Sequence, residues 1–218
     1  MTFNPPAVQP RRPALFIDKD GTLVENLPYN VDPARIRLAP DALAAAARLH
    51  GQGYRLVVVT NQAGVALGKF EERALERVEH RLRELLAEGG VPLGGMYWCP
   101  HDPGGVVARY AIDCTCRKPN PGLLWKAARD FDIDLSRSWM VGDILDDVEA
   151  GRRAGCRTVL LDVGHETQWR LSSLRLPHVV ASSLARAAEA IADTGRDPAH
   201  EAQALAHNRP TEAHHANH

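Results

Sequence analysis

A surplus of charge of either sign is lacking in this sequence of 218 residues. The 26 Lys and Arg residues balance 27 Asp and Glu residues, which leaves a formal net charge of -1. A chain without excess charge has no field with which to attract nucleic acid or an anionic membrane. Long apolar runs are also missing, because none approaches the ~20 residues of a membrane span. Neither nucleic acid nor membrane is therefore expected as a partner, and a small-molecule substrate is favoured.

The beginning of the chain lacks the apolar segment of a secretory signal peptide. Residues 1–13 are instead rich in proline, which predicts a flexible lead. Residues 14–195 have the apolar and charged content of one globular domain, and no internal repeat is visible. Residues 196–218 are polar and carry five of the ten histidines, which predicts a disordered tail or, alternatively, adventitious metal binding. We expect a cytoplasmic monomer.

Cysteine is scarce, and its placement is informative. Three of the four cysteines lie close together as Cys99, Cys114 and Cys116, with His101 among them. In a chain expected to be cytoplasmic, such a cluster is more often a metal site than a disulfide framework. Three thiolates and one imidazole form a closed tetrahedral set that suits Zn²⁺ in a structural role, with free thiols as the alternative. Cys156 stands apart and is interpreted as a packing residue.

Apolar runs alternate with helical patterns along the domain. The runs predict strands at 14–17, 54–59, 96–98, 139–141, 158–161 and 179–180. The patterns predict helices at 41–50, 71–88, 144–154 and 183–192, and a further helix with Asn120 as its N-cap and Pro121 at its first position. This alternation predicts an α/β fold with three layers, in which helices cover both faces of a doubly wound, mostly parallel sheet.

The first predicted strand delivers two carboxylates, Asp18 and Asp20, just before Gly21. Because side chains alternate along an extended chain, both acids should lie on one side. Two such acids would repel each other unless a hard cation such as Mg²⁺ sat between them. One carboxylate could then attack a phosphorus atom while the other moves a proton. An acid pair on a solvated loop is the alternative interpretation.

Other polar residues follow later predicted strands, at the sheet edge where ligands of such folds bind. Thr60 and its neighbours end one apolar run, although an ordinary turn uses the same residue types. Arg117 and Lys118 precede a predicted helix, where cations could stabilise phosphoryl oxygens or could form a solvated basic turn. Asp143 ends another run and could complete the metal site, with Asp147 supporting it one turn later.

In this order, the motifs D-x-D-G-T, T-N-Q, R-K-P-N-P-G and V-G-D resemble those of the haloacid dehalogenase (HAD) superfamily. The resemblance implies a hydrogen bond from Thr60 to the transferring phosphoryl group, and it makes Lys118 the lysine of the third motif. The intervals of about 40 residues between Asp18 and Thr60 and under 60 between Thr60 and Lys118 leave no room for a separate cap domain. We therefore expect an open pocket.

When the loop that carries the predicted zinc ligands Cys99, His101, Cys114 and Cys116 (the zinc loop) is considered together with these motifs, residues 15–161 are similar to one family of that superfamily. This family is the D-glycero-D-manno-heptose 1,7-bisphosphate 7-phosphatases. The resemblance implies that Asp18 is the nucleophile, Asp20 the proton donor and base, and that Asp18, Asp20 and Asp143 hold Mg²⁺. The residues implied to contact a small phosphorylated sugar are Asn26, Leu27, Pro28, Tyr29, Thr60, Asn61, Gln62, Ala63, Arg117 and Lys118.

Two departures weaken the substrate assignment. The loop that begins at Asn26 is less polar than the acidic loop of some family members, and Ile144 stands where some carry a lysine that contacts substrate. A histidinol-phosphate phosphatase, which shares the zinc loop and the motifs, is the alternative within the enzyme class. A catalytically silent, zinc-stabilised binding module is the alternative from another class, and the intact pair of Asp18 and Asp20 argues against it.

Overall fold

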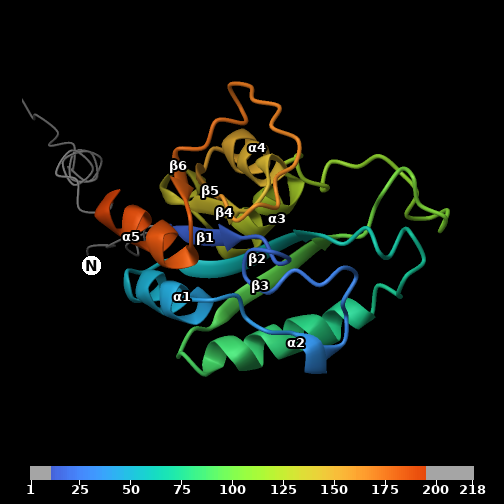
Figure 1. The fold of residues 1–218 in the computed structure, drawn as a ribbon, viewed down its shortest axis with the longest axis horizontal. Coiled ribbons are helices and arrows are strands. Elements are labelled where there is room, and N and C mark those ends of the chain that lie inside the picture. The colour runs from blue at the N-terminus through green and yellow to red at the C-terminus, as the bar shows by residue number, and fades with distance from the viewer. Residues whose placement is uncertain (1–10, 195–218) are drawn as a thin grey trace, which may run out of the picture.

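One parallel sheet of six strands organises the protein, in the order β3-β2-β1-β4-β5-β6. The computed structural model describes residues 11–194, and Figure 1 shows the helices on both faces of this sheet. Every neighbouring pair of strands is parallel, which confirms the predicted α/β class. The strands are β1 (Ala14–Ile17), β2 (Arg55–Asn61), β3 (Leu93–Cys99), β4 (Trp139–Gly142), β5 (Arg157–Leu161) and β6 (Val179–Ala181).

The helices form the two outer layers. Residues of α1, α2 and α5 pack with one face of the sheet in the larger apolar core, and residues of α3 and α4 pack with the other face. The helices are α1 (Ala42–Gly51), α2 (Ala74–Ala87), α3 (Gly122–Phe131), α4 (Leu145–Ala154) and α5 (Leu184–Thr194), and two short 3₁₀ turns lie at Pro33–Arg35 and Leu135–Arg137.

The central strand β1 shows why the sheet is buried on both sides. Leu15 and Ile17 face the larger core, whereas Ala14 and Phe16 face the other one. All four side chains are buried. A strand covered by helices on both faces has no polar side, so it appears in the sequence as a continuous apolar run.

Several predicted boundaries shift by a few residues. The helix expected from residue 71 begins at Ala74, and the strand expected at 96–98 is β3, which begins at Leu93. Asn120 does not cap α3. Its side-chain amide donates to the Cys114 carbonyl at 3.0 Å, and α3 begins one residue after Pro121.

The intervals between the strands are short, as predicted. Only α1 and one 3₁₀ turn separate β1 from β2, and only α2 lies between β2 and β3. Within residues 11–194 there is therefore no separate cap domain, which confirms that expectation. No helix in this range is both long enough and apolar enough to cross a bilayer. Most of the predicted lead, and the predicted tail from residue 196, lie outside the described residues.

Candidate active site

Three carboxylates meet at the carboxyl ends of β1 and β4. Asp18 directly follows β1, and its N–H donates to the Val141 carbonyl at 2.9 Å, which continues the pairing of the two strands. Asp143 follows β4, and Asp147 lies in the first turn of α4. One oxygen from each of these acids lies within 4.8 Å of the others, and all three side chains are buried. The sheet therefore joins residues that are about 125 positions apart in sequence.

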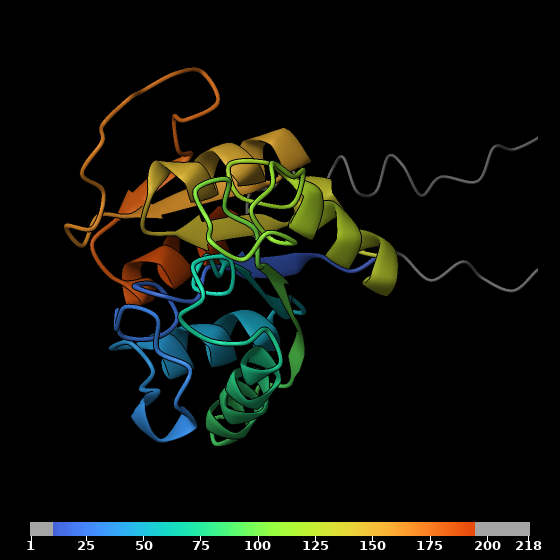
Figure 2. The ribbon, with the colours of Figure 1, turned by 90° about the vertical axis from the view of Figure 1, so that its right-hand side faces the viewer.

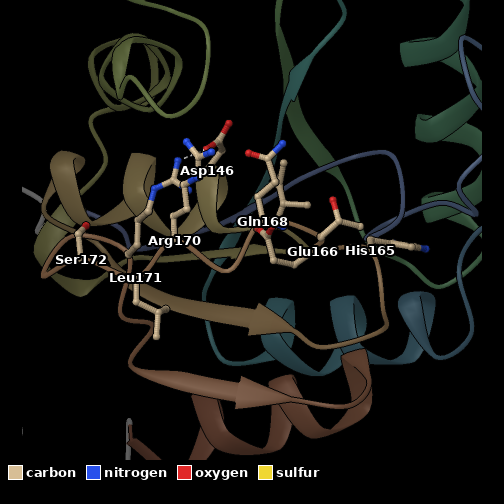
Figure 3. Close-up of a pocket in the computed structure, with 10 residues that line it drawn as sticks. Asp146, His165, Glu166, Gln168, Arg170, Leu171 and Ser172 are labelled. Atoms are coloured by element: carbon tan, nitrogen blue, oxygen red, sulfur yellow. Dashed lines mark hydrogen bonds and ion pairs between the residues drawn. The ribbon is translucent and has the colours of Figure 1, made fainter.

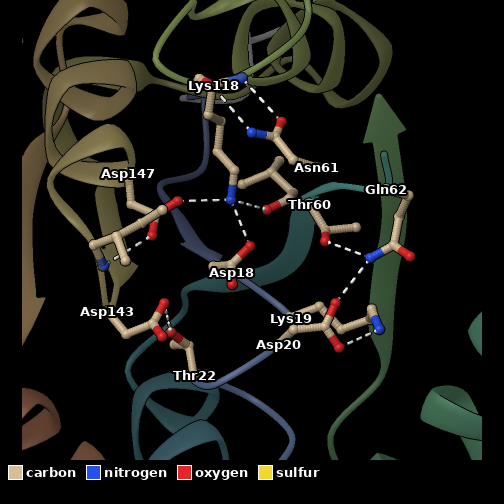
Figure 4. A network of polar contacts seen from close by, with 12 residues as sticks. Asp18, Lys19, Asp20, Thr22, Thr60, Asn61, Gln62, Lys118, Asp143 and Asp147 are labelled. Carbon is tan, nitrogen blue, oxygen red and sulfur yellow. Dashed lines mark hydrogen bonds and ion pairs between the residues drawn. The ribbon is translucent and has the colours of Figure 1, made fainter. Parts of the chain in front are cut away.

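The Lys118 ammonium lies between two of these acids (Figure 4). Its Nζ is 2.5 Å from Asp18 Oδ1 and 2.6 Å from Asp147 Oδ1, and it donates to the Val59 carbonyl at 3.0 Å. Burial disfavours its charge, but the carboxylates of Asp147 and Asp18 outweigh burial and raise the pKa of Lys118. Lys118 is therefore a fixed cation beside Asp18.

One ammonium does not balance three buried carboxylates. Burial raises the pKa of Asp18 to about 7 although Lys118 opposes the shift, and burial also raises the pKa values of Asp143 and Asp147. A divalent cation would favour the charged forms and fill this deficit. The donors are carboxylate oxygens, which are the ligands that Mg²⁺ prefers. The composition and charge of this group therefore fit a hard divalent cation.

Asp20 is not part of this group of carboxylates. Its Oδ1 lies 2.5 Å from Lys19 Nζ, and its Oδ2 accepts from Gln62 Nε2 at 2.9 Å, so its side chain lies to one side of Asp18 in Figure 4. The chain stops being extended here, because β1 ends at Ile17 and a turn begins at Lys19, where the N–H groups of Leu23 and Val24 donate to the carbonyls of Asp18 and Lys19. The alternation expected for a strand therefore ends between the two acids.

Two side chains expected to line the substrate site hold catalytic candidates in place. The Asn61 amide forms two hydrogen bonds of 3.0 Å with the backbone N–H and carbonyl of Lys118. The Gln62 amide donates to Thr60 Oγ1 at 3.0 Å as well as to Asp20, and so links these two residues. Thr60 itself is buried beside this network. Asn61 and Gln62 of the T-N-Q motif therefore hold Lys118 and Asp20 in position through hydrogen bonds.

The remaining residues implied to contact substrate lie at the rim. Asn26, Pro28 and Tyr29 are exposed, and Leu27 and Ala63 are half-buried. Tyr29 adopts a φ of +54°, and Lys69 Nζ lies 6.0 Å from the centre of its ring. None of these side chains hydrogen-bonds to the grouped carboxylates within the described part of the chain. They border the site without forming part of its buried network.

The predicted zinc ligands come together in the loop that follows β3. Cys99 Sγ lies 3.5 Å from Cys114 Sγ and 3.2 Å from Cys116 Sγ, and His101 Nδ1 lies 3.5 Å from Cys99 Sγ and 3.3 Å from Cys116 Sγ. A zinc tetrahedron with ~2.3 Å bonds to sulfur has edges of about 3.7 Å. The four atoms therefore fit one metal ion. Hydrogen bonds, first from Cys99, lower the pKa of Cys116 to about 5, whereas the hydrogen bond with Cys116 and burial raise the pKa of Cys99.

This cysteine and histidine loop also positions Arg117. The Arg117 backbone N–H donates to Cys114 Sγ at 3.3 Å, and its side chain donates to the His101 carbonyl at 3.1 Å. Its other terminal nitrogen lies 3.1 Å from Asp102 Oδ2. The guanidinium is thus oriented by the loop and already has one carboxylate partner.

Sequence reasoning missed two residues of the segment between β5 and β6. His165 Nδ1 lies 2.7 Å from Asp143 Oδ2, opposite Thr22 Oγ1, which donates to Asp143 Oδ1 at 3.2 Å. Glu166 Oε2 accepts from the N–H of Leu145, the first residue of α4, at 2.6 Å. Neither residue lies at a distance in sequence from the motifs that would mark it as part of the site. Figure 2 shows their segment in orange and the cysteine and histidine loop in green.

Gly21 carries the one signal that could have pointed to this crowding. A Cβ at residue 21 would lie 2.3 Å from Asp143 Oδ2 and 2.7 Å from His165 Nδ1. Real Cβ atoms do not approach other atoms so closely, and the positive φ adds a second cost for any other residue. The glycine of D-x-D-G-T is therefore required both by the turn and by the side chains around Asp143.

Comparisons with known proteins agree with this geometry. Residues 115–187 match the HAD-hydrolase-like family. The D-glycero-beta-D-manno-heptose-1,7-bisphosphate 7-phosphatase of Salmonella typhi is 38% identical over 172 residues, which cover 74% of this chain and 91% of that protein. The D-glycero-D-manno-heptose-1,7-bisphosphate 7-phosphatase of Thermosynechococcus vestitus is 39% identical over 185 residues, which cover 82% and 94%.

A solved structure shares the fold. The crystal structure of D,D-heptose 1,7-bisphosphate phosphatase from B. bronchiseptica, complexed with magnesium and phosphate, superposes with a TM-score of 0.68 at 30% identity. The superposition covers 84% of this chain and 99% of that one. The likeness therefore extends over nearly the whole length of that enzyme.

Proposed function

This chain belongs to the HAD superfamily and is a phosphoric monoester hydrolase, and we propose that it removes the 7-phosphate of D-glycero-D-manno-heptose 1,7-bisphosphate. The observation that carries this proposal is the buried group of Asp18, Lys118 and Asp143 in a chain 38% identical over 91% of a phosphatase of that name. A cytoplasmic location and a monomeric state stay predictions from the sequence.

Asp18 is the nucleophile of the proposed reaction. One of its oxygens forms a bond to phosphorus while the bond from phosphorus to the sugar oxygen breaks, which leaves an aspartyl phosphate. Asp20 donates a proton to the departing sugar oxygen. In the second half, Asp20 takes a proton from a water molecule that attacks the same phosphorus, and inorganic phosphate leaves as Asp18 is regenerated. Gln62 and Lys19 hold the Asp20 carboxylate for both transfers.

Lys118 and the metal site supply positive charge to this reaction. The ion pair with Asp147 and the two hydrogen bonds between the Asn61 amide and the Lys118 backbone (the Asn61 clamp) hold Lys118 beside Asp18. Lys118 can therefore face the phosphoryl oxygens without moving. We keep Asp18, Asp20 and Asp143 as the proposed Mg²⁺ ligands, with Asp20 contributing its backbone carbonyl because its side chain is turned away. Mg²⁺, when bound, would neutralise phosphoryl oxygens.

We assign a structural Zn²⁺ to Cys99, His101, Cys114 and Cys116. Four protein ligands fill a tetrahedral shell and leave no position for substrate, so this ion would not act in the chemistry. Its proposed effect is indirect, since Cys114 and His101 contact Arg117, the residue next to Lys118. Arg117 would contact substrate from this loop, and Thr60 would donate a hydrogen bond to the phosphoryl group.

A histidinol-phosphate phosphatase remains the second candidate, because two observations favour a monophosphate. Arg117 already pairs with Asp102, and Ile144 offers no charge for a second phosphate. Steady-state measurement of kcat/KM for both anomers of heptose bisphosphate and for histidinol phosphate separates the two. We expect a preference of at least about tenfold for a bisphosphate, as one charged contact can provide. A preference for histidinol phosphate would reject the proposed substrate.

A further inference from the structure

A cleft of about 500 Å³ opens beside the carboxylate group, between the start of α4 and the segment joining β5 to β6 (Figure 3). Ile144 and His165 are among the residues that line it. Ile144 directly follows Asp143, and His165 is the residue that contacts the Asp143 carboxylate. A molecule whose phosphoryl group reaches Asp18 could therefore extend into this cleft. Its volume lies within the ~300–1,000 Å³ of small-molecule sites.

The charges of the cleft are not all matched. Arg175 lies within ion-pair distance of both Asp146 and Glu149, so two carboxylates compensate it. The Glu166 carboxylate accepts from the backbone N–H groups of Leu145 and Gln168, each at 2.6 Å. Arg170 also lines the cleft, and within residues 11–194 its guanidinium has no carboxylate in ion-pair distance. Arg170 is thus the cation of the cleft whose charge is available to a ligand.

The rest of the lining suits a hydrophilic anion. Thr167, Gln168 and Ser172, which also line the cleft, offer hydroxyl and amide donors. Arg170 itself is exposed, so a dissolved ligand can reach it. The planar guanidinium can donate two parallel hydrogen bonds to a phosphate, which an ammonium cannot do. Arg117, by contrast, shares its guanidinium with Asp102 and a backbone carbonyl.

We infer that this cleft binds the phosphate of the substrate that is not cleaved, and that Arg170 determines specificity for a bisphosphate over a monophosphate. The inference rests on the proposed function, because it assigns a place to the second phosphate of that substrate. The contact lies away from the reacting phosphorus, so it contributes mainly to binding and should be visible in KM more than in kcat.

The test compares Arg170→Ala with Arg170→Lys and with Arg129→Ala, an exposed arginine of α3 outside the cleft. KM and kcat are measured for heptose bisphosphate and for p-nitrophenyl phosphate, which has no second phosphate. We expect Arg170→Ala to raise KM for the bisphosphate by about 10- to 100-fold, the effect of one lost charge-assisted contact, with kcat within about twofold. Arg170→Lys should recover part of the loss, and Arg129→Ala should match the wild type on both substrates.

The values on p-nitrophenyl phosphate separate a binding role from a structural one. Equal losses on both substrates in Arg170→Ala would show that the residue supports the fold, and no loss on the bisphosphate would show that it binds nothing there. Either result overturns the inference while the phosphatase activity of the wild type stands.

Inhibition by the product keeps the inference testable if the proposed substrate is wrong. Should the wild type cleave p-nitrophenyl phosphate but not the bisphosphate, heptose 1-phosphate is tested as a competitive inhibitor. An inhibition constant at least about tenfold higher in Arg170→Ala than in the wild type supports the cleft. Equal constants in the two proteins overturn it.

Discussion

The two clusters of side chains that could hold a metal ion differ in how they are built. The cysteine and histidine cluster draws four ligands from residues 99–116, and they approach one another at 3.2–3.5 Å. The carboxylate cluster draws on Asp18 and on Asp143 with Asp147, and it contains the Lys118 ammonium. The first set can be completed by one ion and then has no free position. The second leaves oxygens and a cation facing a common space, which phosphoryl transfer requires.

Two consecutive residues connect the clusters. The N–H of Arg117 donates to a cysteine sulfur, and the side chain of Lys118 reaches Asp18. The cysteine and histidine cluster therefore fixes the backbone next to Lys118, and Lys118 supplies the cation of the carboxylate cluster. Variants of the carboxylate cluster, Lys118 included, should abolish chemistry and leave the fold intact, whereas variants of Arg117 should have smaller effects.

The largest effect is expected for Asp18→Asn. The amide is nearly isosteric with the carboxylate but cannot act as the nucleophile, and no other group replaces it. Turnover of heptose bisphosphate and of p-nitrophenyl phosphate should be eliminated, while the thermal unfolding midpoint stays near that of the wild type. Near-normal rates in this variant would show that the assigned mechanism is wrong.

Removal of the exchangeable metal should affect the carboxylate cluster and leave the metal of the cysteine and histidine cluster in place. Hard oxygen ligands bind Mg²⁺ reversibly, whereas thiolates hold Zn²⁺ far more tightly. Brief EDTA treatment should reduce activity to background, and added Mg²⁺ should restore it in protein that still contains one zinc per chain by elemental analysis. Protein purified without chelator and found free of zinc would remove the structural role assigned to the cysteine loop.

An intermediate effect is expected for Asp20→Asn. Loss of the proton shuttle should lower kcat by about 10²–10⁴-fold, the usual contribution of general acid–base catalysis. Asp193→Asn, an exposed acid of α5, is the matched control and should leave kcat unchanged. The measurement is kcat on a substrate with a poor leaving group. A loss below about tenfold there would assign the proton transfer to another residue.

The smallest effect is expected for Arg117→Ala. Its guanidinium is shared with Asp102 and the His101 carbonyl, so only part of its charge is available to substrate. KM for heptose bisphosphate should rise by no more than about tenfold, with a smaller change for histidinol phosphate. Equal losses on both substrates would assign Arg117 to the structure of the loop instead of to recognition of a second phosphate.

The sheet and the strand-end acids could be predicted from the sequence because both leave local patterns. A strand buried on two faces appears as a continuous apolar run, as β1 does, and Asp18 and Asp143 stand at the ends of such runs. The four ligands of the cysteine and histidine cluster were equally visible, since they lie within 18 positions of one another.

Contacts between distant segments could not be predicted in this way. The Asn61 clamp joins residues 57 positions apart, and His165 reaches Asp143 from a loop without regular structure. The orientation of Asp20 was missed for a different reason. The turn begins at Lys19, between the two acids, so strand alternation does not hold for Asp20, and the sequence does not show which side of the turn its carboxylate takes.

The central position of β1 has a consequence for the order in which the protein forms during synthesis. Residues 14–17 leave the ribosome first among the strands, but their partners at 55–58 and 139–141 follow only later. The backbone partner of Asp18 is the carbonyl of Val141, so the proposed nucleophile is anchored only after about two thirds of the chain has been made. A nascent chain that ends before β4 carries Asp18 and Asp20, the two proposed catalytic residues, and yet lacks the rest of the proposed site. Phosphatase activity in a truncation series should therefore appear abruptly, once β4 and α4 are complete.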